Sequence, residues 1–413
     1  MKILISAYAC EPDKGSEPEV GWQWVMHLAA HCDVTVLTRS NNRDAIESKL
    51  QTLSGPCPTV VYMDLSSNMR RLKRVVRPQF LSVSWYYSMW QRRAKKELEI
   101  LCADQNFDLV HHLTIASFRL PFAVAALGVP CVVGPVGGCE DFPEELLPKG
   151  ALKIRLKETI RNWMTRLHTR AGVGMKRYMQ ADQVLASTQE MCQVFKKWGV
   201  DSMVVPQIGM PKLQKGIDRE KSANTEAGVR LLFVGGVLYW KGVELALQAL
   251  VKLPNNVTLH FLGSGADLST LKAEVVRLGL ENRVQFLGWV PRSEVLALYG
   301  EYDVFFYPSL HDSGAFTVIE AMAAGLPVIC LDRGGPALSV TDVCGKVVTT
   351  GSRQNTIMGL IHAVEYYLQH PEMIALHGSN GRKRIMSEYD WETKSREMLK
   401  LYESVIRKGS RDE

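Results

Sequence analysis

The sequence predicts an α/β protein with two doubly wound parallel sheets arranged in tandem. Short apolar runs alternate with longer amphipathic stretches along most of the 413 residues, as in β-α-β units whose helices cover both faces of a parallel sheet. This periodicity is lost at 206–228, where Pro, Gly, Lys and Asn collect. We therefore expect a first domain at 1–205, a linker at 206–228, a second domain at 229–390, and a C-terminal helix at 391–413 that packs back on the first domain.

The first domain contains apolar runs of strand length at regular intervals. They are Ile3–Ser6, Val34–Leu37, Val60–Tyr62, Leu109–His111, Cys131–Gly134, Val184–Ala186 and Val204–Pro206. Between the first two runs, Val20–Ala30 has the apolar spacing of a helix. A helix between successive strands is the connection that parallel pairing requires.

The second domain repeats the alternation from Leu231 onward. Its expected strands are 231–236, Thr258–Phe261, Val284–Phe286, Val304–Tyr307 and Val328–Leu331. Its expected helices are Val243–Val251, Leu268–Leu278, Ser293–Tyr299, Thr317–Ala324 and Asn355–Gln369, and two more helical stretches follow Pro371. The strict succession of strand and helix again favours a parallel sheet.

Composition excludes several protein classes. Hydrophobic residues make up 46% and charged residues 22% of the chain, and no stretch reaches the roughly 18 consecutive apolar residues of a membrane span. We expect neither an integral membrane protein nor a disordered chain. The start, Met1–Cys10, reads as a buried first strand rather than a secretion signal. Nine cysteines without a Cys-x-x-Cys pair indicate thiols in a reducing compartment, the cytoplasm.

Positive charge gathers in two windows, although the net charge is only +6. Residues 68–97 and 149–178 each hold nine Lys or Arg and one Glu. Aromatic or aliphatic residues interleave with these cations, which suits the surface of an anionic bilayer. The alternative is a solvated helical face whose aromatics belong to the core. No nucleic-acid motif accompanies the charge, so we expect no nucleic-acid partner.

Glycines mark the loops that follow the expected strands. Gly15 to Gly21 lead from the first strand into a helix, but no G-x-G-x-x-G or Walker A motif occurs at such a turn. In the second domain, Gly235 and Gly236 precede Lys241 at a helix start, where an ammonium and backbone N–H groups suit a diphosphate. A solvated loop lysine is the alternative. Two further glycines, Gly263 and Gly265, follow the next strand.

The most informative segment contains two carboxylates. Asp312 lies in a Gly-containing loop after a strand, and Glu320 follows eight positions later within an apolar helix. A buried charge at Glu320 requires donors, and sugar hydroxyls are such donors. Backbone N–H groups at the helix start are the alternative partners.

These motifs together resemble the retaining glycosyltransferases of family four, which have the GT-B fold of two facing Rossmann-like domains. The resemblance covers essentially the whole chain. It depends on 15–21, 233–242, 262–265, 287–291, 312–320 with the following Ala-Met-Ala-x-Gly-x-Pro-Val, and 334–336. It implies transfer of a hexosyl group from a nucleotide-sugar, with a UDP-sugar as the first expectation, to a saccharide acceptor that is lipid-linked. The setting would be surface polysaccharide or glycolipid synthesis at the inner face of a membrane, with the enzyme attached peripherally.

The resemblance also assigns roles to residues. Asp312 would contact the donor sugar, Glu320 the ribose, and Lys241 the leaving diphosphate. The other expected donor-binding residues are Gly235, Gly236, Gly263, Gly265, Val290, Ser313, Gly314, Ala315 and Phe316. The acceptor side would include Gly15, Ser16, Glu17 and His112, with His111 and Arg119 in the catalytic group. For both histidines, a strand end with ordinary hydrogen bonds is the alternative.

The sequence departs from the family pattern at two positions. Gly236 replaces the usual Arg, so one phosphate-binding cation is missing, and Arg119 is a candidate substitute. Asp312 replaces a Glu and shortens the sugar contact by one methylene. The missing Arg motivates a second hypothesis, a catalytically weak sugar-nucleotide-binding scaffold of a polysaccharide assembly complex. A GT-B epimerase is disfavoured by the segment from Asp312 to Glu320.

Neither a metal nor a cofactor is expected besides the donor substrate. The chain has no Asp-x-Asp, and its cysteines and histidines lack ligand spacing. Lys241, helix N-termini and loop amides would then stabilise the leaving diphosphate. In the front-side mechanism that the resemblance implies, the departing phosphate accepts the proton of the incoming hydroxyl, and catalysis is mainly positioning and electrostatics.

Overall fold

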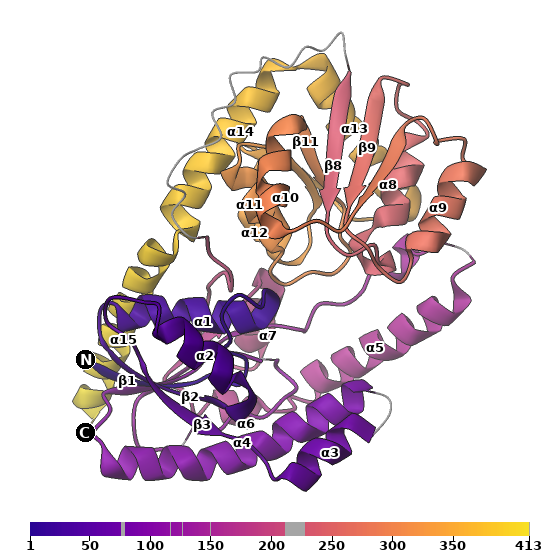
Figure 1. The fold of residues 1–413 in the computed structure, drawn as a ribbon. Coiled ribbons are helices and arrows are strands. Elements are labelled where there is room, and N and C mark those ends of the chain that lie inside the picture. The colour runs from indigo at the N-terminus through magenta and orange to yellow at the C-terminus, as the bar shows by residue number, and fades with distance from the viewer. Residues whose placement is uncertain (76–78, 116, 126, 149, 211–227, 413) are drawn as a thin grey trace. The chain divides into compact units, whose positions relative to one another are not determined.

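The computed structural model describes the chain except for residues 76–78, 116, 126, 149, 211–227 and 413 (Figure 1). It divides into two compact units. Unit 1 comprises Met1–Cys139, Thr165–Gln207 and Trp391–Glu413, and unit 2 comprises Glu140–Met164 and Ile208–Asp390. Most of the expected linker at 206–228 lies outside the described residues.

Unit 1 is built on a seven-stranded parallel sheet in the order β3-β2-β1-β4-β5-β6-β7. The strands are β1 (Lys2–Ser6), β2 (Asp33–Arg39), β3 (Thr59–Met63), β4 (Leu109–His112), β5 (Cys131–Val136), β6 (Gln183–Ala186) and β7 (Ser202–Val204). Its helices include α1 (Ser16–Ala29), α2 (Arg43–Leu50), α3 (Ser67–Val75), α4 (Gln79–Asp104), α6 (Met175–Tyr178), α7 (Gln189–Lys197) and α15 (Trp391–Asp412). The strand order reverses between β1 and β4, so the loops that follow these two strands diverge and leave a crevice for ligands.

Unit 2 is built on a six-stranded parallel sheet in the order β10-β9-β8-β11-β12-β13. The strands are β8 (Val229–Val234), β9 (Val257–Leu262), β10 (Val284–Gly288), β11 (Val304–Tyr307), β12 (Val328–Leu331) and β13 (Gly345–Val348). Its helices include α8 (Val243–Leu250), α9 (Leu268–Arg277), α10 (Arg292–Leu298), α11 (Phe316–Ala323), α12 (Gly334–Ser339), α13 (Arg353–Gln369) and α14 (Glu372–Arg384). The order reverses between β8 and β11.

The predicted α/β class with two doubly wound parallel sheets is confirmed. Each expected strand is present with bounds shifted by at most a few residues. The edge strand β13 was not expected, because it is short and contains a glycine and a lysine, which are depleted in strands. The division of the chain also differs from the expected one, since Glu140–Met164 groups with unit 2.

The C-terminal helix α15 is part of unit 1. The ring of Trp391, at its start, meets Trp24 of α1 edge to face, with 5.3 Å between the ring centroids. Farther along α15, the Tyr402 hydroxyl lies 2.6 Å from His111 Nδ1 at the end of β4. Trp391 and Tyr402 are both buried, so α15 completes the core around the sheet of unit 1.

Most of the first basic window lies in α3 and α4, and three of its aromatic side chains are buried, whereas Trp85 is 38% exposed. Tyr86, Tyr87 and Trp90 are buried, and the Tyr8 ring meets both Tyr87 and Trp90 at 5.1 Å between centroids. The membrane prediction was therefore wrong for these aromatics, which fit the alternative of core residues. Across the described residues, every helix is either too short or too polar to span a bilayer.

The described structure predicts a pH dependence of stability from Lys394 of α15. Its ammonium is buried, donates to Pro206 O at 2.7 Å, and has its pKa lowered by burial to about 7. An unfolded lysine has a pKa of about 10.4, so the unfolded chain binds more protons between pH 7 and 10 and the free energy of unfolding rises with pH. We expect Lys394→Met to reduce that rise from pH 7 to 9 by about 2 kcal/mol, measured by chemical denaturation.

The matched control is Lys400→Met, because Lys400 is exposed on the same helix. Its pH profile should follow the wild type. If the free energy of unfolding rose equally with pH in the two variants, Lys394 would not be the buried lysine of lowered pKa that causes the rise.

Candidate active site

The reversal of strand order in unit 2 places two functional loops next to each other. One loop follows β8 and carries Gly235, Gly236 and the short helix η4 (Tyr239–Lys241). The other follows β11 and carries Asp312. Because β8 and β11 are neighbours in the sheet, residues separated by about seventy positions in sequence meet at one carboxyl edge.

A cluster of three side chains forms at this edge. The Lys241 ammonium forms an ion pair with Asp312 Oδ2 and donates to the Tyr307 hydroxyl at 2.8 Å. The Tyr307 hydroxyl in turn donates to Asp312 Oδ2 at 2.6 Å. Burial alone would raise the pKa of Asp312, but Lys241, Tyr307 and the Gly314 N–H together bring that pKa below its ordinary value. The carboxylate is therefore ionised, and the sequence-predicted pair Lys241 and Asp312 does come together.

Glycines let the loop backbones pack directly against one another. A Cβ atom on Gly263 would lie 2.1 Å from Gly235 O, and a Cβ atom on Gly265 would lie 2.3 Å from Val237 O. A Cβ atom on Gly334, whose φ is 58°, would lie 2.1 Å from Asp312 O. Any larger residue at these positions would push the loops apart.

The helix that follows Asp312 begins with a strained residue. Ala315 has a φ of 55°, a left-handed conformation that costs a non-glycine residue of order 1–3 kcal/mol. This turn directs the chain from Gly314 into α11 at Phe316. The predicted donor-binding residues Ser313 to Phe316 therefore form the loop and first turn beside Asp312, but no contact with a ligand tests their role.

Glu320 is buried in α11 and has a charged partner. Arg292 of α10 binds its Oε1 through Nε at 2.8 Å and Nη2 at 2.6 Å, and the Tyr299 hydroxyl lies 3.4 Å from Oε2. Burial raises the pKa of Glu320, and Arg292 counteracts that rise. The need for donors at Glu320 is thus met by a guanidinium, and its contact with a ribose stays a prediction, as does that of the half-buried Val290.

A second polar cluster of unit 2 was not found from the sequence. It involves α5 (Leu152–Arg170), a single helix that starts in unit 2 and ends in unit 1 (Figure 1). Tyr239 donates to the buried Glu158 Oε1 at 2.6 Å, and Arg161 Nε lies 3.2 Å from Glu158 Oε2. The pKa of His311, next to Asp312, is lowered by burial and by the positive charge of Arg161. Arg161 is therefore a cation within electrostatic range of the loop that carries Asp312.

The reversal of strand order in unit 1 also collects predicted residues. Glu17 Oε1, in the first turn of α1, accepts a hydrogen bond from the Ile115 N–H at 2.6 Å, and burial raises the pKa of this carboxyl. Gly15 and Ser16 are exposed with positive φ. The first turn of α1 thus reaches the loop after β4 through Glu17, although its role toward an acceptor stays a prediction.

The two histidines of β4 are fully buried. Because Gly134 O can only accept, His111 Nε2 carries the proton it donates there at 2.9 Å, and Nδ1 accepts from Tyr402. Burial lowers the pKa of His111 to about 4. Both ring nitrogens are thus engaged inside unit 1, which favours the alternative of ordinary strand-end hydrogen bonds over catalysis.

His112 has one internal partner on its ring. Its Nε2 lies 3.2 Å from the Tyr87 hydroxyl, and burial lowers its pKa to about 3. Arg119 is also tied to unit 1, since its guanidinium donates to Gly138 O at 3.2 Å and to Thr165 Oγ1 at 2.5 Å. The expected roles of both residues stay predictions.

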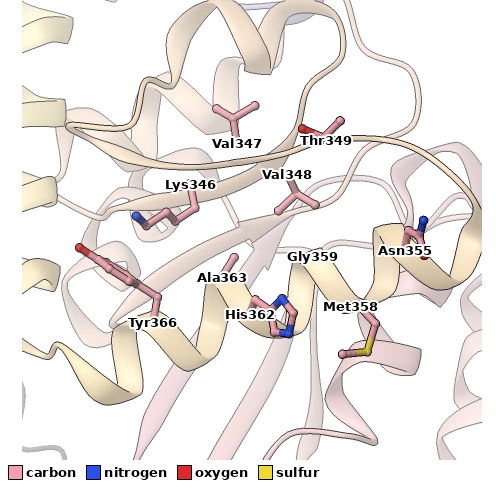
Figure 2. A pocket seen from close by; sticks show the side chains of 10 residues that line it. All are labelled: Lys346, Val347, Val348, Thr349, Asn355, Met358, Gly359, His362, Ala363 and Tyr366. Atoms are coloured by element: carbon pink, nitrogen blue, oxygen red, sulfur yellow. The ribbon is translucent and has the colours of Figure 1, made fainter.

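A separate pocket of about 550 Å³ lies in unit 2 between β13 and α13 (Figure 2). Figure 2 shows the Lys346 side chain directed toward Tyr366, and the ammonium lies 3.6 Å from the centroid of that ring. Val348, Met358 and Ala363 contribute apolar surface. The pocket shares no residue with the cluster around Asp312, and no sequence motif pointed to it.

Comparison with known proteins finds a family match over part of the chain. Residues 214–384 match the model of the glycosyl transferases group 1, so this part of the chain is similar to that family. A 2-deoxystreptamine glucosyltransferase of Streptomyces kanamyceticus is 29% identical over 187 residues, 44% of this chain and 47% of the relative. A lipopolysaccharide core biosynthesis mannosyltransferase of Rhizobium leguminosarum is 29% identical over 42% of this chain and 50% of the relative.

Solved structures match the fold of this chain over nearly its whole length. Anabaena HepE in complex with UDP has a TM-score of 0.58 at 18% identity, covering 98% of this chain and 100% of that one. Sucrose-phosphate synthase of Thermosynechococcus elongatus has a TM-score of 0.63 at 18% identity, covering 98% and 99%. The predicted GT-B architecture is thereby confirmed, whereas the two sequence relatives named above match over only about half of their own length.

The ion pair of Lys241 and Asp312 predicts a stability effect. In Lys241→Met, Asp312 stays buried without its cation, and we expect the free energy of unfolding at pH 7 to fall by about 3 kcal/mol. Because the ion pair lowers the pKa of Asp312, it stabilises the fold fully at pH values above the ordinary pKa of an aspartate. The difference should narrow as the pH falls from 7 to 4, where the unpaired carboxyl of the variant takes up a proton, and vanish below the lowered wild-type pKa.

Chemical denaturation at pH 7 and pH 4 measures this difference. Lys252→Met, which removes an exposed lysine of unit 2, should change neither value by more than about 0.5 kcal/mol. A pH-independent loss in Lys241→Met would rule out the ion pair as its cause.

Proposed function

We propose that this chain is a metal-independent, retaining hexosyltransferase that uses a nucleotide-sugar, with a UDP-sugar first, and a lipid-linked saccharide acceptor. The observation that supports it best is the cluster of Lys241, Tyr307 and Asp312. It lies where the strand order of unit 2 reverses, between loops whose backbones pack closely at glycines. Such an edge offers a cation and backbone N–H groups to a diphosphate.

The reaction needs charge stabilisation more than a protein nucleophile. The bond between the anomeric carbon and the phosphate oxygen breaks, the acceptor oxygen attacks from the same face, and its proton passes to the departing phosphate. Negative charge grows on the diphosphate, so a preorganised ammonium at Lys241 would stabilise the transition state more than the ground state. Asp312 would then exchange Lys241 for a sugar hydroxyl when the donor binds.

A second cation would offset the absence of Arg at position 236. We place Arg161 first in this role, because it acts on His311 beside Asp312 within unit 2. The earlier candidate, Arg119, donates to Gly138 O and Thr165 Oγ1 within unit 1. The guanidinium of Arg119 would have to leave these partners to meet a phosphate, and that of Arg161 would have to remain shared with Glu158.

The donor and acceptor classes are supported by the relatives. The structure of HepE contains UDP, and other neighbours include lipopolysaccharide glycosyltransferases WaaB and WaaG. Together with the mannosyltransferase of R. leguminosarum, they favour an acceptor in surface polysaccharide or glycolipid synthesis. A lipid-linked acceptor would place the enzyme on the cytoplasmic inner face of a membrane.

Loss of Lys241 should appear mainly in turnover. We expect Lys241→Ala to lower turnover at saturating donor by roughly a hundredfold or more, about 3 kcal/mol, and Lys241→Arg to recover only part of it. Sugar transfer or slow donor hydrolysis by folded protein measures the effect. If the variant merely raises the Michaelis constant, another cation faces the leaving group. Wild-type protein that binds donor but never turns it over would favour the scaffold hypothesis instead.

Ribose recognition by Glu320 should appear in nucleotide affinity. Glu320→Gln keeps the shape and removes the charge, so we expect the affinity for UDP to fall by about 1.5–3 kcal/mol. Calorimetry with UDP and with its deoxyribose analogues isolates the hydroxyl contact, because the variant should no longer distinguish them. Arg292→Gln serves as the comparison, since it removes the partner of Glu320 but retains the carboxylate. Unchanged discrimination in Glu320→Gln would show that Glu320 only holds Arg292.

A further inference from the structure

Helix α5 turns polar side chains inward and apolar side chains outward. Glu158, Asn162 and Thr165 are at most 2% exposed. The apolar stripe of α5 consists of six side chains that are between 42% and 72% exposed, namely Leu152, Leu156, Ile160, Trp163, Met164 and Leu167. This arrangement is the reverse of an ordinary surface helix, whose apolar face packs on the core.

Specific hydrogen bonds fix the rotation of the helix. The Asn162 amide accepts from the Phe142 N–H and donates to Phe142 O, both at 2.7 Å. One turn earlier, Glu158 accepts from Tyr239. These buried partners cannot be given up without leaving polar groups unpaired, so the apolar stripe must face outward.

The charges of α5 flank its apolar stripe. At about 100° per residue, the stripe covers roughly a third of the circumference and lies opposite the buried polar face. By that spacing, the exposed cations Lys157 and Arg166 border the stripe on its two sides, and the exposed Lys153 and Arg170 lie level with its two edges. The single carboxylate of the helix, Glu158, is buried, so every charged side chain that α5 exposes is positive.

An anionic bilayer suits this surface best. An apolar stripe bordered by cations is the pattern of helices that lie in the plane of a membrane, and tryptophan favours that depth. A helix of 19 residues with six Lys or Arg does not cross a bilayer but can rest in its interface. A protein partner would need an acidic groove of matching length, and a second copy of α5 would bring like charges together.

We propose that the apolar stripe of α5 inserts into the interface of an anionic membrane and seats the enzyme there. Because this surface would bring the enzyme to a lipid-linked acceptor, the inference rests on the function proposed above. Tyr239, which α5 binds through Glu158, is two residues from Lys241. The membrane-facing helix and the donor loop of unit 2 are thus one connected element.

Sedimentation of the full chain with vesicles tests the proposal. Wild type should bind phosphatidylcholine vesicles that contain phosphatidylglycerol and bind pure phosphatidylcholine at least about tenfold more weakly. Leu156→Ser/Ile160→Ser/Trp163→Ser should lower partitioning onto the anionic vesicles at least about tenfold. Lys153→Gln/Arg166→Gln/Arg170→Gln should lower it at low salt and leave little difference at high salt.

The matched control removes three exposed apolar side chains from other helices, as Ile100→Ser/Val276→Ser/Leu376→Ser. It should bind vesicles like the wild type. Wild-type binding by the stripe variant, or a wild-type dimer that the stripe variant abolishes, would overturn the proposal. UDP binding without vesicles is measured in parallel and should be equal in all variants. Its absence throughout would count against the proposed function, and retained vesicle binding would still support the membrane surface.

Discussion

The partly buried ion pair of Lys241 and Asp312 is the interaction on which the candidate site depends. Two charges removed from water require close, well-bonded partners, and Tyr307 provides a hydroxyl that bonds both. This geometry exists only because β8 and β11 are adjacent while their loops lead away from each other. The glycines that let the neighbouring backbones touch bring the two loops close enough for the pair to form.

Much of the fold could be predicted because buried parallel strands leave a strong trace in sequence. β12 is a short apolar run between glycines, and its predicted bounds agree with the structure. β13 left no such trace, since an edge strand need not be apolar on both faces. For α4, composition revealed cations and aromatics but not which face is buried, and packing places Tyr87 and Trp90 in the core.

The sequence predicts the parts of the candidate site whose residues lie in one segment of the chain. It does not predict contacts between residues that are far apart in sequence. Asp312 and Glu320 stand out as charges in an apolar segment. The partners of Glu320 and Tyr239 do not, because Arg292 and Glu158 lie 28 and 81 positions away. No local pattern marks such pairs, so the sequence could show that Glu320 needed donors but could not show that a guanidinium supplies them.

In helix α5, buried hydrogen bonds set the rotation of the helix even though its apolar side chains stay exposed as a result. Rotating α5 by half a turn would bury the apolar stripe, and each such side chain is worth about 1.5–3 kcal/mol when fully buried. The same rotation would expose Glu158 and Asn162 and leave Tyr239 and the backbone of Phe142 without their partners. The hydrogen bonds of Glu158 and Asn162 to Tyr239 and Phe142 therefore determine which face is outward. An apolar stripe that the polar bonds hold outward loses contact with water only if another apolar phase covers it. The interior of an anionic bilayer is such a phase, and its headgroups would meet the cations that border the stripe.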